Sequence, residues 1–345
     1  MQNQLSFEDR CTGAIYGMFI GDALAMPVHW YYDTFALRMD YGLVRDYLAP
    51  KNPHPDSILW RSSYTPPHAR ADILHDQAQY WGRRGIHYHQ FLEAGENTLN
   101  LQLARNLFTF LHREPEYSAE KWLQELIDYM TTPGKHNDTY VEEYLRHFFL
   151  NYGRGVPPLS CGRKDEHHIG GLSQLLPVLL CYADRPQHAC RTALDHLKLT
   201  HGGTIMENGA QIVANILIGV LQGEVLEAAI QRACTESPSA IARHELETLI
   251  DFADDVVIGR HFSSACYMDQ SLPATLYLAM KYADAPEQGL IANTMAGGDN
   301  VGRGTVLGAF LGAANGLAGF PRRWLSGLKS EPPSIHQEKE DKHSS

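Results

Sequence analysis

The sequence predicts an all-α fold built as a single domain. Alternating runs of β-branched residues, which mark strands, are almost absent along the 345 residues. Apolar residues instead recur at helical spacing in many segments, and neither an interior linker nor a fixed repeat divides the chain. Near both ends glycines recur every four residues, at Gly13, Gly17 and Gly21 and again from Gly304 to Gly316. We therefore expect one many-helix bundle whose two chain ends share a core.

The first expected helix starts near Phe7 and ends where Met26-Pro27 interrupts it. Each glycine inside a helix costs about 1 kcal/mol relative to alanine, so three in register need a compensating close contact. The matching stripe near the C-terminus is the natural partner, and this pairing would bring Asp22 toward Asp299. His29 follows in an aromatic loop. Taken alone, His29 is typical of a structural histidine.

Residues 41–89 form a long irregular segment interrupted by prolines, with no apolar period. Long segments of this kind are often lids or binding loops. A surface for a partner or a mobile excursion is an equally good interpretation. His87 and His89 alone are weak evidence for a metal, because no third ligand stands near them in the sequence.

Helical patterns account for most of the remaining chain. The pattern after Asn97 and Thr98, which we expect to cap a helix, carries leucines at Leu99, Leu103, Leu107 and Leu111. Further helices are expected at Ala119–Met130, Tyr140–Leu150, Gln187–Leu197, Glu207–Leu221, Glu224–Cys234, Ala240–Val257 and Ser271–Tyr282. We expect one helical domain over residues 1–325 and a disordered, mostly polar tail over residues 326–345.

A glycine pair and an acid precede the second glycine-striped helix, at Gly297, Gly298 and Asp299. Free N–H groups and the positive end of the helix dipole favour a carboxylate or a bound anion at such a helix start. The segment is either the capped start of a tightly packed structural helix or the rim of a functional site. Arg303 fits a phosphate or a carboxylate, or a surface salt bridge.

Composition excludes several classes of function. A net charge of -11 argues against a nucleic-acid partner, because no basic surface stands out. The six cysteines have no metal-finger spacing and are expected to be reduced thiols. No signal peptide is evident at the N-terminus, and no segment is expected to span a membrane, the best candidate being Gly304–Phe320. We therefore expect a cytoplasmic protein that acts on a small molecule.

With these segments placed, the chain resembles the ADP-ribosylglycohydrolase family, which includes jellyfish crystallins. The resemblance covers about residues 8–322. It rests on the Gly-Asp-Ala-Leu-x-x-Pro signature within 17–27, on the segments 95–98 and 170–177, on Thr200-His201, and on 297–299 with the helix that follows. The resemblance implies an all-α orthogonal bundle with a cleft that holds two magnesium ions. Members hydrolyse N- or O-glycosidic bonds of ADP-ribose.

The chain departs from the family at its metal-binding motifs. A Thr-Asp-Asp-Thr run is replaced by Gly95, Glu96, Asn97 and Thr98, and a Gly-Gly-Asp-x-Asp-Thr run reads Gly-Gly-Asp-Asn-Val-Gly over 297–302. The usual glutamate after the first signature is His29. Because magnesium prefers several hard oxygen ligands, we expect no metal centre and no cofactor. One weakly held cation remains an alternative.

Two functions remain open. The first is a hydrolase that cleaves a glycosidic bond of an ADP-ribose-like or other sugar or nucleoside substrate without the two magnesium ions. Its expected catalytic residues are Glu96, Asp299 and His29, with His201 as an alternative proton carrier. The second is an inactive nucleotide-sugar-binding or crystallin-like structural protein. The expected substrate-binding residues are Asn97, Thr98, Gly297, Gly298, Asn300, Arg303 and His201. The sequence identifies neither the substrate nor the oligomeric state.

Overall fold

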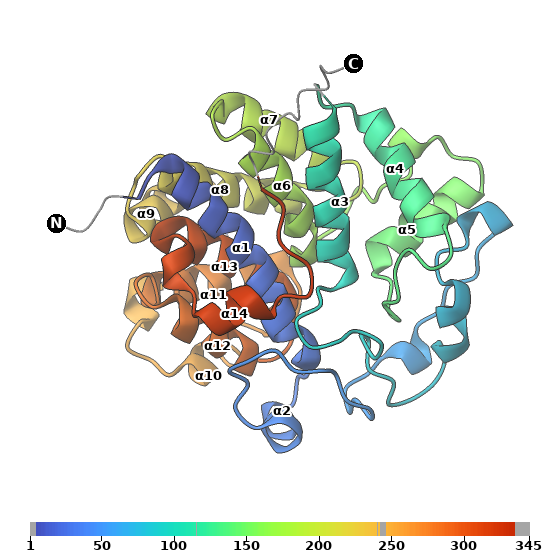
Figure 1. The fold of residues 1–345 in the computed structure, drawn as a ribbon, viewed down its shortest axis with the longest axis horizontal. Helices are drawn as coiled ribbons and strands as arrows, with labels where there is room; N and C mark the ends of the chain where they lie inside the picture. Colours follow the sequence, from blue (N-terminus) through green and yellow to red (C-terminus); the bar gives the residue numbers. More distant parts are fainter. Residues whose placement is uncertain (1–4, 115, 240, 242–245, 335–345) are drawn as a thin grey trace, which may run out of the picture.

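The computed structural model describes residues 5–114, 116–239, 241 and 246–334. Two helices run side by side through its middle, α1 (Phe7–Ala25) and α13 (Asn300–Asn315), one from each end of the chain (Figure 1). Both are buried along most of their length, which agrees with the predicted shared core. The other helices surround this pair, and the described residues contain isolated β-bridges but no strand.

Glycines form the contact between α1 and α13. Gly17 lies against Gly308, and a Cβ atom on either residue would overlap the backbone carbonyl of the other. Gly21 with Gly304, and Gly13 with Gly312, repeat this arrangement along the helices. Backbones approach this closely only where neither helix carries a side chain. The four-residue glycine spacing therefore predicted the central contact correctly.

The surrounding helices mostly follow the predicted segments. They are α2 (Thr34–Tyr41), α3 (Leu99–Arg113), α4 (Ala119–Thr131), α5 (Glu143–Gly153), α6 (Leu172–Cys181), α7 (Pro186–Leu197), α8 (Thr204–Leu221), α9 (Leu226–Glu236), α10 (Asp254–Val257), α11 (Met268–Lys281), α12 (Pro286–Met295) and α14 (Arg322–Gly327). Of these, α2, α6, α12 and α14 were not predicted as helices. The all-α fold is confirmed.

Two predicted helices differ from those observed. The helix expected at Ala240–Val257 is not continuous: its described part contains a short 3₁₀ turn, Leu246–Leu249, and the four-residue α10. Here the Phe252 carbonyl and the Asp254 side chain are instead bound by Lys281 of α11. The helix expected from Tyr140 begins at Glu143, because Glu142, its N-cap, has an extended backbone with φ -63° and ψ 159°.

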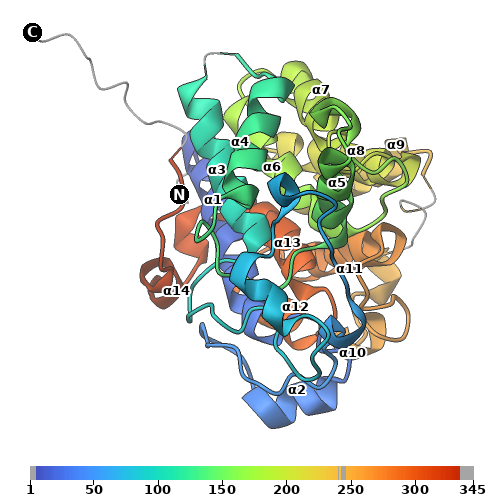
Figure 2. The same ribbon diagram turned by 90° about the vertical axis from the view of Figure 1, so that its right-hand side faces the viewer.

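The long irregular segment between α2 and α3 has 3₁₀ turns but no α-helix among its residues. It lies along one edge of the molecule, where blue gives way to teal in Figure 1, and Figure 2 shows it from the front. Leu59 and Tyr88 of this segment form a small apolar cluster with Tyr140, and Trp30 and Trp81 pack against it. This cluster forms part of the cavity described below.

The start of the predicted tail contacts the helical body. The Lys329 N–H donates to the carbonyl of Gly95 at 3.0 Å, and its ammonium group pairs with Glu93 at 2.6 Å. Glu331 contacts Arg105 of α3 and Tyr16 of α1. Residues 335–345, the rest of the predicted tail, lie outside the described residues.

Two helical segments are long and apolar enough to cross a membrane by length and composition, Phe7–Val28 and Thr204–Leu221. The best candidate expected from the sequence, Gly304–Phe320, is not one of them. Within the fold, 89% and 67% of their apolar windows are buried, which is also what core helices of a soluble protein show.

Candidate active site

Asp299 is held at the start of α13 by the backbone around it. Gly297 and Gly298 both have positive φ angles, 63° and 60°, which glycine adopts without strain. The Gly298 N–H donates to the Tyr31 carbonyl, and the Asp299 N–H donates to the Ser264 carbonyl. As the N-cap of α13, the Asp299 side chain accepts the Gly302 N–H at 3.1 Å. The two glycines therefore allow the backbone turn that directs the Asp299 carboxylate.

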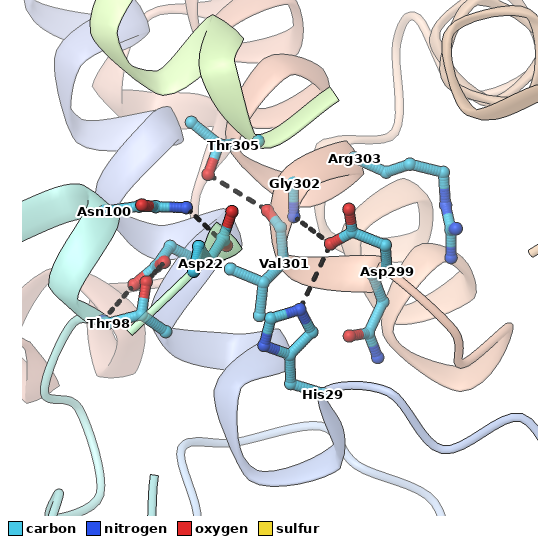
Figure 3. Close-up of polar contacts among 12 residues, drawn as sticks. Asp22, His29, Thr98, Asn100, Asp299, Val301, Gly302, Arg303 and Thr305 are labelled. Atoms are coloured by element: carbon cyan, nitrogen blue, oxygen red, sulfur yellow. Dashed lines mark hydrogen bonds and ion pairs between the residues drawn. The ribbon is translucent and has the colours of Figure 1, made fainter. Parts of the chain in front are cut away.

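His29 reaches Asp299 from the end of α1. A short 3₁₀ turn, Met26–Val28, follows α1 and turns the chain so that His29 Nε2 lies 3.1 Å from Asp299 Oδ1 (Figure 3). The next residue, Trp30, has a φ of 60°, a strained conformation for a bulky residue. Its N–H bonds to the Gly298 carbonyl and its ring stacks on His29 at 3.9 Å. Strain of this kind is common where a side chain must be aimed for function.

A cavity of about 320 Å³ opens beside these residues. Aromatic rings form much of its wall: Trp30, Tyr32, Tyr88, Tyr140 and Tyr267. Its charged and titratable lining consists of Asp299, Glu142, Glu143, Arg61, His168 and Cys266. An aromatic wall with a few convergent polar groups is typical of a small-molecule site, and rings of this kind pack well against sugars or bases.

Two carboxyl groups on this cavity have opposite pKa shifts. Burial and the nearby charge of Asp299 raise the pKa of Glu142 to about 8. The Glu142 carboxyl also accepts a hydrogen bond from Asn100 at 2.8 Å. Burial alone would raise the pKa of Asp299, but hydrogen bonds from His29 and the Gly302 N–H lower it. At neutral pH one group is therefore a proton donor and the other an anion.

His168 lines the cavity beside Cys266 and is paired with the Glu166 carboxylate. His168 hydrogen-bonds to Cys266 and lies 2.5 Å from the buried Glu166 carboxylate. Burial alone would lower the pKa of His168, but its contacts with Cys266 and Glu166 raise this pKa to about 11. In turn, the hydrogen bond and charge of His168 help to lower the pKa of Glu166 to about 2. His168 is thus an imidazolium, and burial raises the pKa of the Cys266 thiol. His168 therefore presents a positive charge at the cavity wall, and the Glu166 carboxylate balances it.

Of the three predicted catalytic residues, the structure brings together His29 and Asp299 but not Glu96. The Glu96 carboxylate turns back to accept the N–H of Glu93 at 2.6 Å, and Lys329 lies nearby. Glu96 does not line the cavity. The prediction that it converges with Asp299 therefore fails, because residues 93–96 form a local turn that holds the side chain.

Asn97 and Thr98 donate hydrogen bonds to a buried carboxylate on α1. Asp22 accepts the Asn97 amide at 2.8 Å, the Thr98 N–H at 2.9 Å and the Thr98 hydroxyl at 2.6 Å. These contacts fasten the start of α3 to α1, as the dashes from Thr98 show in Figure 3. Thr98 is the N-cap residue of α3 by position, but its side chain does not cap the helix.

The other predicted binding residues lie behind the cavity wall. Arg303 is fully buried and donates to Asn293 and to the carbonyls of Ser264 and Gly297. The Asn300 amide donates to the carbonyls of Val28 and Thr294. Gly297, Gly298, Asn300 and Arg303 thus support the loop that carries Asp299. His201 packs against Tyr144 and Gly171, and like the others does not line the cavity.

Residues at the family's metal-binding positions do not fit a two-magnesium centre. Asp299 is a carboxylate at these positions, but the Glu96 carboxylate accepts the Glu93 N–H instead, whereas Mg²⁺ prefers several carboxylate oxygens. The Asn300 amide donates through its nitrogen, and its oxygen, buried without a hydrogen-bond partner, offers a single neutral ligand. Val301 and Gly302 offer no side-chain oxygen. Across the described part of the chain, no group of three or more His, Cys, Asp or Glu side chains is arranged to hold a metal ion.

Sequence reasoning missed Glu142, the carboxyl group that pairs with Asp299. It is the N-cap residue of α5 and stands next to Glu143 in the sequence. Adjacent acidic residues are common at a helix start, because the positive end of the helix dipole stabilises their negative charge. Nothing in that local pattern separates a cavity acid from an ordinary helix start. Only the fold shows that Glu142 faces the cavity and Asp299.

Comparison with known proteins assigns the class. The family model for ADP-ribosylglycohydrolase matches residues 3–341. The fold resembles a solved structure described as an ADP-ribosylglycohydrolase-related protein complex, with a TM-score of 0.59, 20% identity, and coverage of 94% of this chain and 93% of that one. The chain belongs to the ADP-ribosylglycohydrolase family, and family and fold together support a hydrolase-like function.

A distant sequence relative is similar over nearly its whole length. It is an uncharacterized protein of Archaeoglobus fulgidus, 25% identical over 335 residues, which cover 93% of this chain and 92% of the relative.

Proposed function

We propose that the protein hydrolyses a glycosidic bond of an ADP-ribose-like or other sugar or nucleoside substrate, without a two-magnesium centre. The observation that carries the proposal is the pair of carboxyl groups on one cavity, Glu142 with a raised pKa and Asp299 with a lowered pKa. Glycosidases use such a pair, one group as the acid and the other as a base or nucleophile. Glu142 replaces Glu96 in this mechanism.

In the proposed reaction, Glu142 donates its proton to the leaving group as the glycosidic bond breaks. Asp299 remains an anion, which either orients an attacking water or attacks the sugar itself. His29, neutral because burial lowers its pKa to about 4, holds the Asp299 carboxylate in place by hydrogen bonding. The aromatic wall positions the planar or sugar portion of the substrate.

A second function is favoured by one observation, the incomplete set of metal ligands. In this alternative the protein is an inactive nucleotide-sugar-binding or crystallin-like structural member of the family. The Val301 and Gly302 substitutions fit it best, since neither residue replaces a lost oxygen ligand. Against it, the cavity retains a charged acid–base pair, which a structural protein does not need.

The two functions are separated by assaying a panel of ADP-ribosylated compounds, nucleosides and simple glycosides for release of the free sugar. Glu142→Gln is expected to lower the rate about 10²–10⁴-fold, the contribution typical of a general acid. Glu96→Gln is the matched control and is expected to keep the rate. A panel that is bound but never cleaved supports the inactive binding protein. Equal rates in wild type and Glu142→Gln would exclude the mechanism.

A further inference from the structure

A chain of hydrogen-bonding side chains leads from Asp299 into the protein interior. His29 Nε2 lies 3.1 Å from Asp299 Oδ1, and His29 Nδ1 lies 2.8 Å from His89 Nε2. His89 Nδ1 lies 2.6 Å from Asp138 Oδ1. The four residues are all buried, with at most 4% of any of them exposed. The chain therefore consists of two carboxyl groups with two imidazole rings between them.

Each of the three contacts needs one hydrogen between its two atoms. Two neutral rings carry two hydrogens, and ionised carboxylates carry none. With only two hydrogens, one of the three contacts would press two lone pairs together at 3.1 Å or less inside the protein. One additional proton satisfies all three contacts. The hydrogen-bond count thus requires one proton more than two neutral rings hold.

Both carboxylates are stabilised as anions, which leaves the rings to carry this proton. Asp138 Oδ2 accepts the Leu99 N–H at 2.8 Å, at the positive start of α3. Asp299 accepts the Gly302 N–H in the same way at the start of α13. Between the rings, burial keeps His29 neutral, whereas His89 is in contact with Asp138 and close to Asp22.

We propose that His89 is a buried imidazolium held by Asp138, and that it fixes His29 as the neutral tautomer that donates Nε2–H to Asp299. In this arrangement His89 Nδ1–H donates to Asp138 and His89 Nε2–H donates to His29 Nδ1. His89 and Asp138 are positioning residues: they act on Asp299 through His29 and do not touch the substrate. Their role in catalysis rests on the proposed hydrolase function. The charge on His89 is independent of that function.

The groups around His89 are consistent with one positive charge. The carboxylates facing it are Asp138 and Asp22. Burial raises the pKa of Asp22 to about 6, and the charge of His89 acts in the opposite direction. The neighbouring rings, His29 and His87, have pKa values lowered by burial and remain neutral. Glu142 and His89 also line a common small cavity of about 10 Å³. The carboxyl groups of Asp138, Asp22 and Glu142 and the neutral rings therefore surround the proposed cation.

The test is nitrogen NMR of the histidine side chains in the substrate-free protein at about pH 7. We expect both ring nitrogens of His89 to carry hydrogens, and His29 to carry one at Nε2. His196 is the internal control, because burial lowers its pKa to about 3 and its ring should be neutral. A neutral His89 in the wild-type protein would overturn the proposal, whatever the protein's activity.

Asp138→Asn then removes the charge and keeps the chain of hydrogen bonds. The Leu99 N–H requires the amide oxygen, so the amide nitrogen faces His89 Nδ1 and supplies the hydrogen that the additional proton supplied before. We expect the His89 imidazolium signal to be lost while His29 keeps its Nε2–H. An imidazolium signal that survives this substitution would contradict the role of Asp138.

Activity provides a separate readout once a substrate is known. With the cation gone, the pKa of Asp299 should rise, so the acid limb of the kcat profile of Asp138→Asn should move to higher pH with little change in KM. A uniform loss at all pH values would indicate a merely structural role and overturn the assignment as positioning residues. If the panel yields no substrate, the NMR result still decides the charge on His89, so the two proposals fail separately.

Discussion

Glu142 and Asp299 line the same cavity from different helix starts, and the charge of Asp299 helps to raise the pKa of Glu142. Asp299, held as an anion by His29 and the first turn of α13, is one of the charges that raise the pKa of Glu142 to about 8. Glu142 stands at the start of α5, about 150 residues away in the chain. A protonated carboxyl group and a carboxylate anion are thus brought to one cavity by the fold rather than by a sequence motif.

The rate of hydrolysis should depend on pH with a maximum between the two carboxyl pKa values. Glu142 must be protonated to donate, so the rate should fall as the pH rises through about 8. Asp299 must be ionised, so the rate should also fall in acid, below the ordinary range for aspartate because its pKa is lowered. The measurement is kcat against pH on any cleaved glycoside. A rate that continues to rise above about pH 9 would exclude Glu142 as the acid.

The effect of Glu142→Gln should depend on the leaving group. A nitrophenolate leaves without protonation, whereas an alcohol or a sugar hydroxyl requires a proton from the acid. The substitution should therefore lower the rate on alkyl glycosides about 10²–10⁴-fold and have a much smaller effect on the nitrophenyl analogues. Equal losses for both leaving groups would mean that Glu142 acts in binding or stability instead.

Gly308→Ala should destabilise the fold strongly. The added Cβ would overlap the backbone carbonyl of Gly17, and neither helix can move without disturbing the other glycine contacts. Overpacking usually costs about 1–3 kcal/mol, and we expect the upper end here. The measurement is chemical or thermal unfolding. The matched control is Thr12→Ala on the outer side of α1, which should change the stability by less than about 1 kcal/mol.

Magnesium and chelators should have little effect on the melting temperature or on turnover. The carboxylates at the family's ion-binding positions are Glu96 and Asp299, and Glu96 is held by the Glu93 N–H, so two magnesium ions would have too few carboxylate ligands. Thermal melts with and without excess Mg²⁺, followed by the glycoside assay in chelator, measure this directly. Turnover that requires Mg²⁺ and stops in chelator would show that the ligand analysis is wrong.

The sequence predicted the fold better than the site. The glycine spacing of four residues gave the central pair of helices, because only a shared bare face explains it, and the placement of Asp299 at a helix start was correct. The pairing of His29 with Asp299 followed from the same reasoning.

What the sequence did not predict depends on contacts between distant segments. Glu96 lies within the expected motif, but a local turn and the Lys329 segment hold it away from the cavity. His89 and Asp138 belong to irregular stretches, where no period fixes the direction of a side chain. Arg303 was expected at a surface or an anion, yet its guanidinium is used entirely to hold neighbouring backbone carbonyls and Asn293.

The most direct test of the acid–anion pair is a carboxyl-carbon NMR titration of Glu142 in the substrate-free protein. We predict a pKa of about 8, which should fall in Asp299→Asn because one of the charges that raise it is removed. A Glu142 pKa near the usual value for glutamate, about 4.3, would contradict the proposed mechanism, because no proton would then be available to the leaving group at neutral pH.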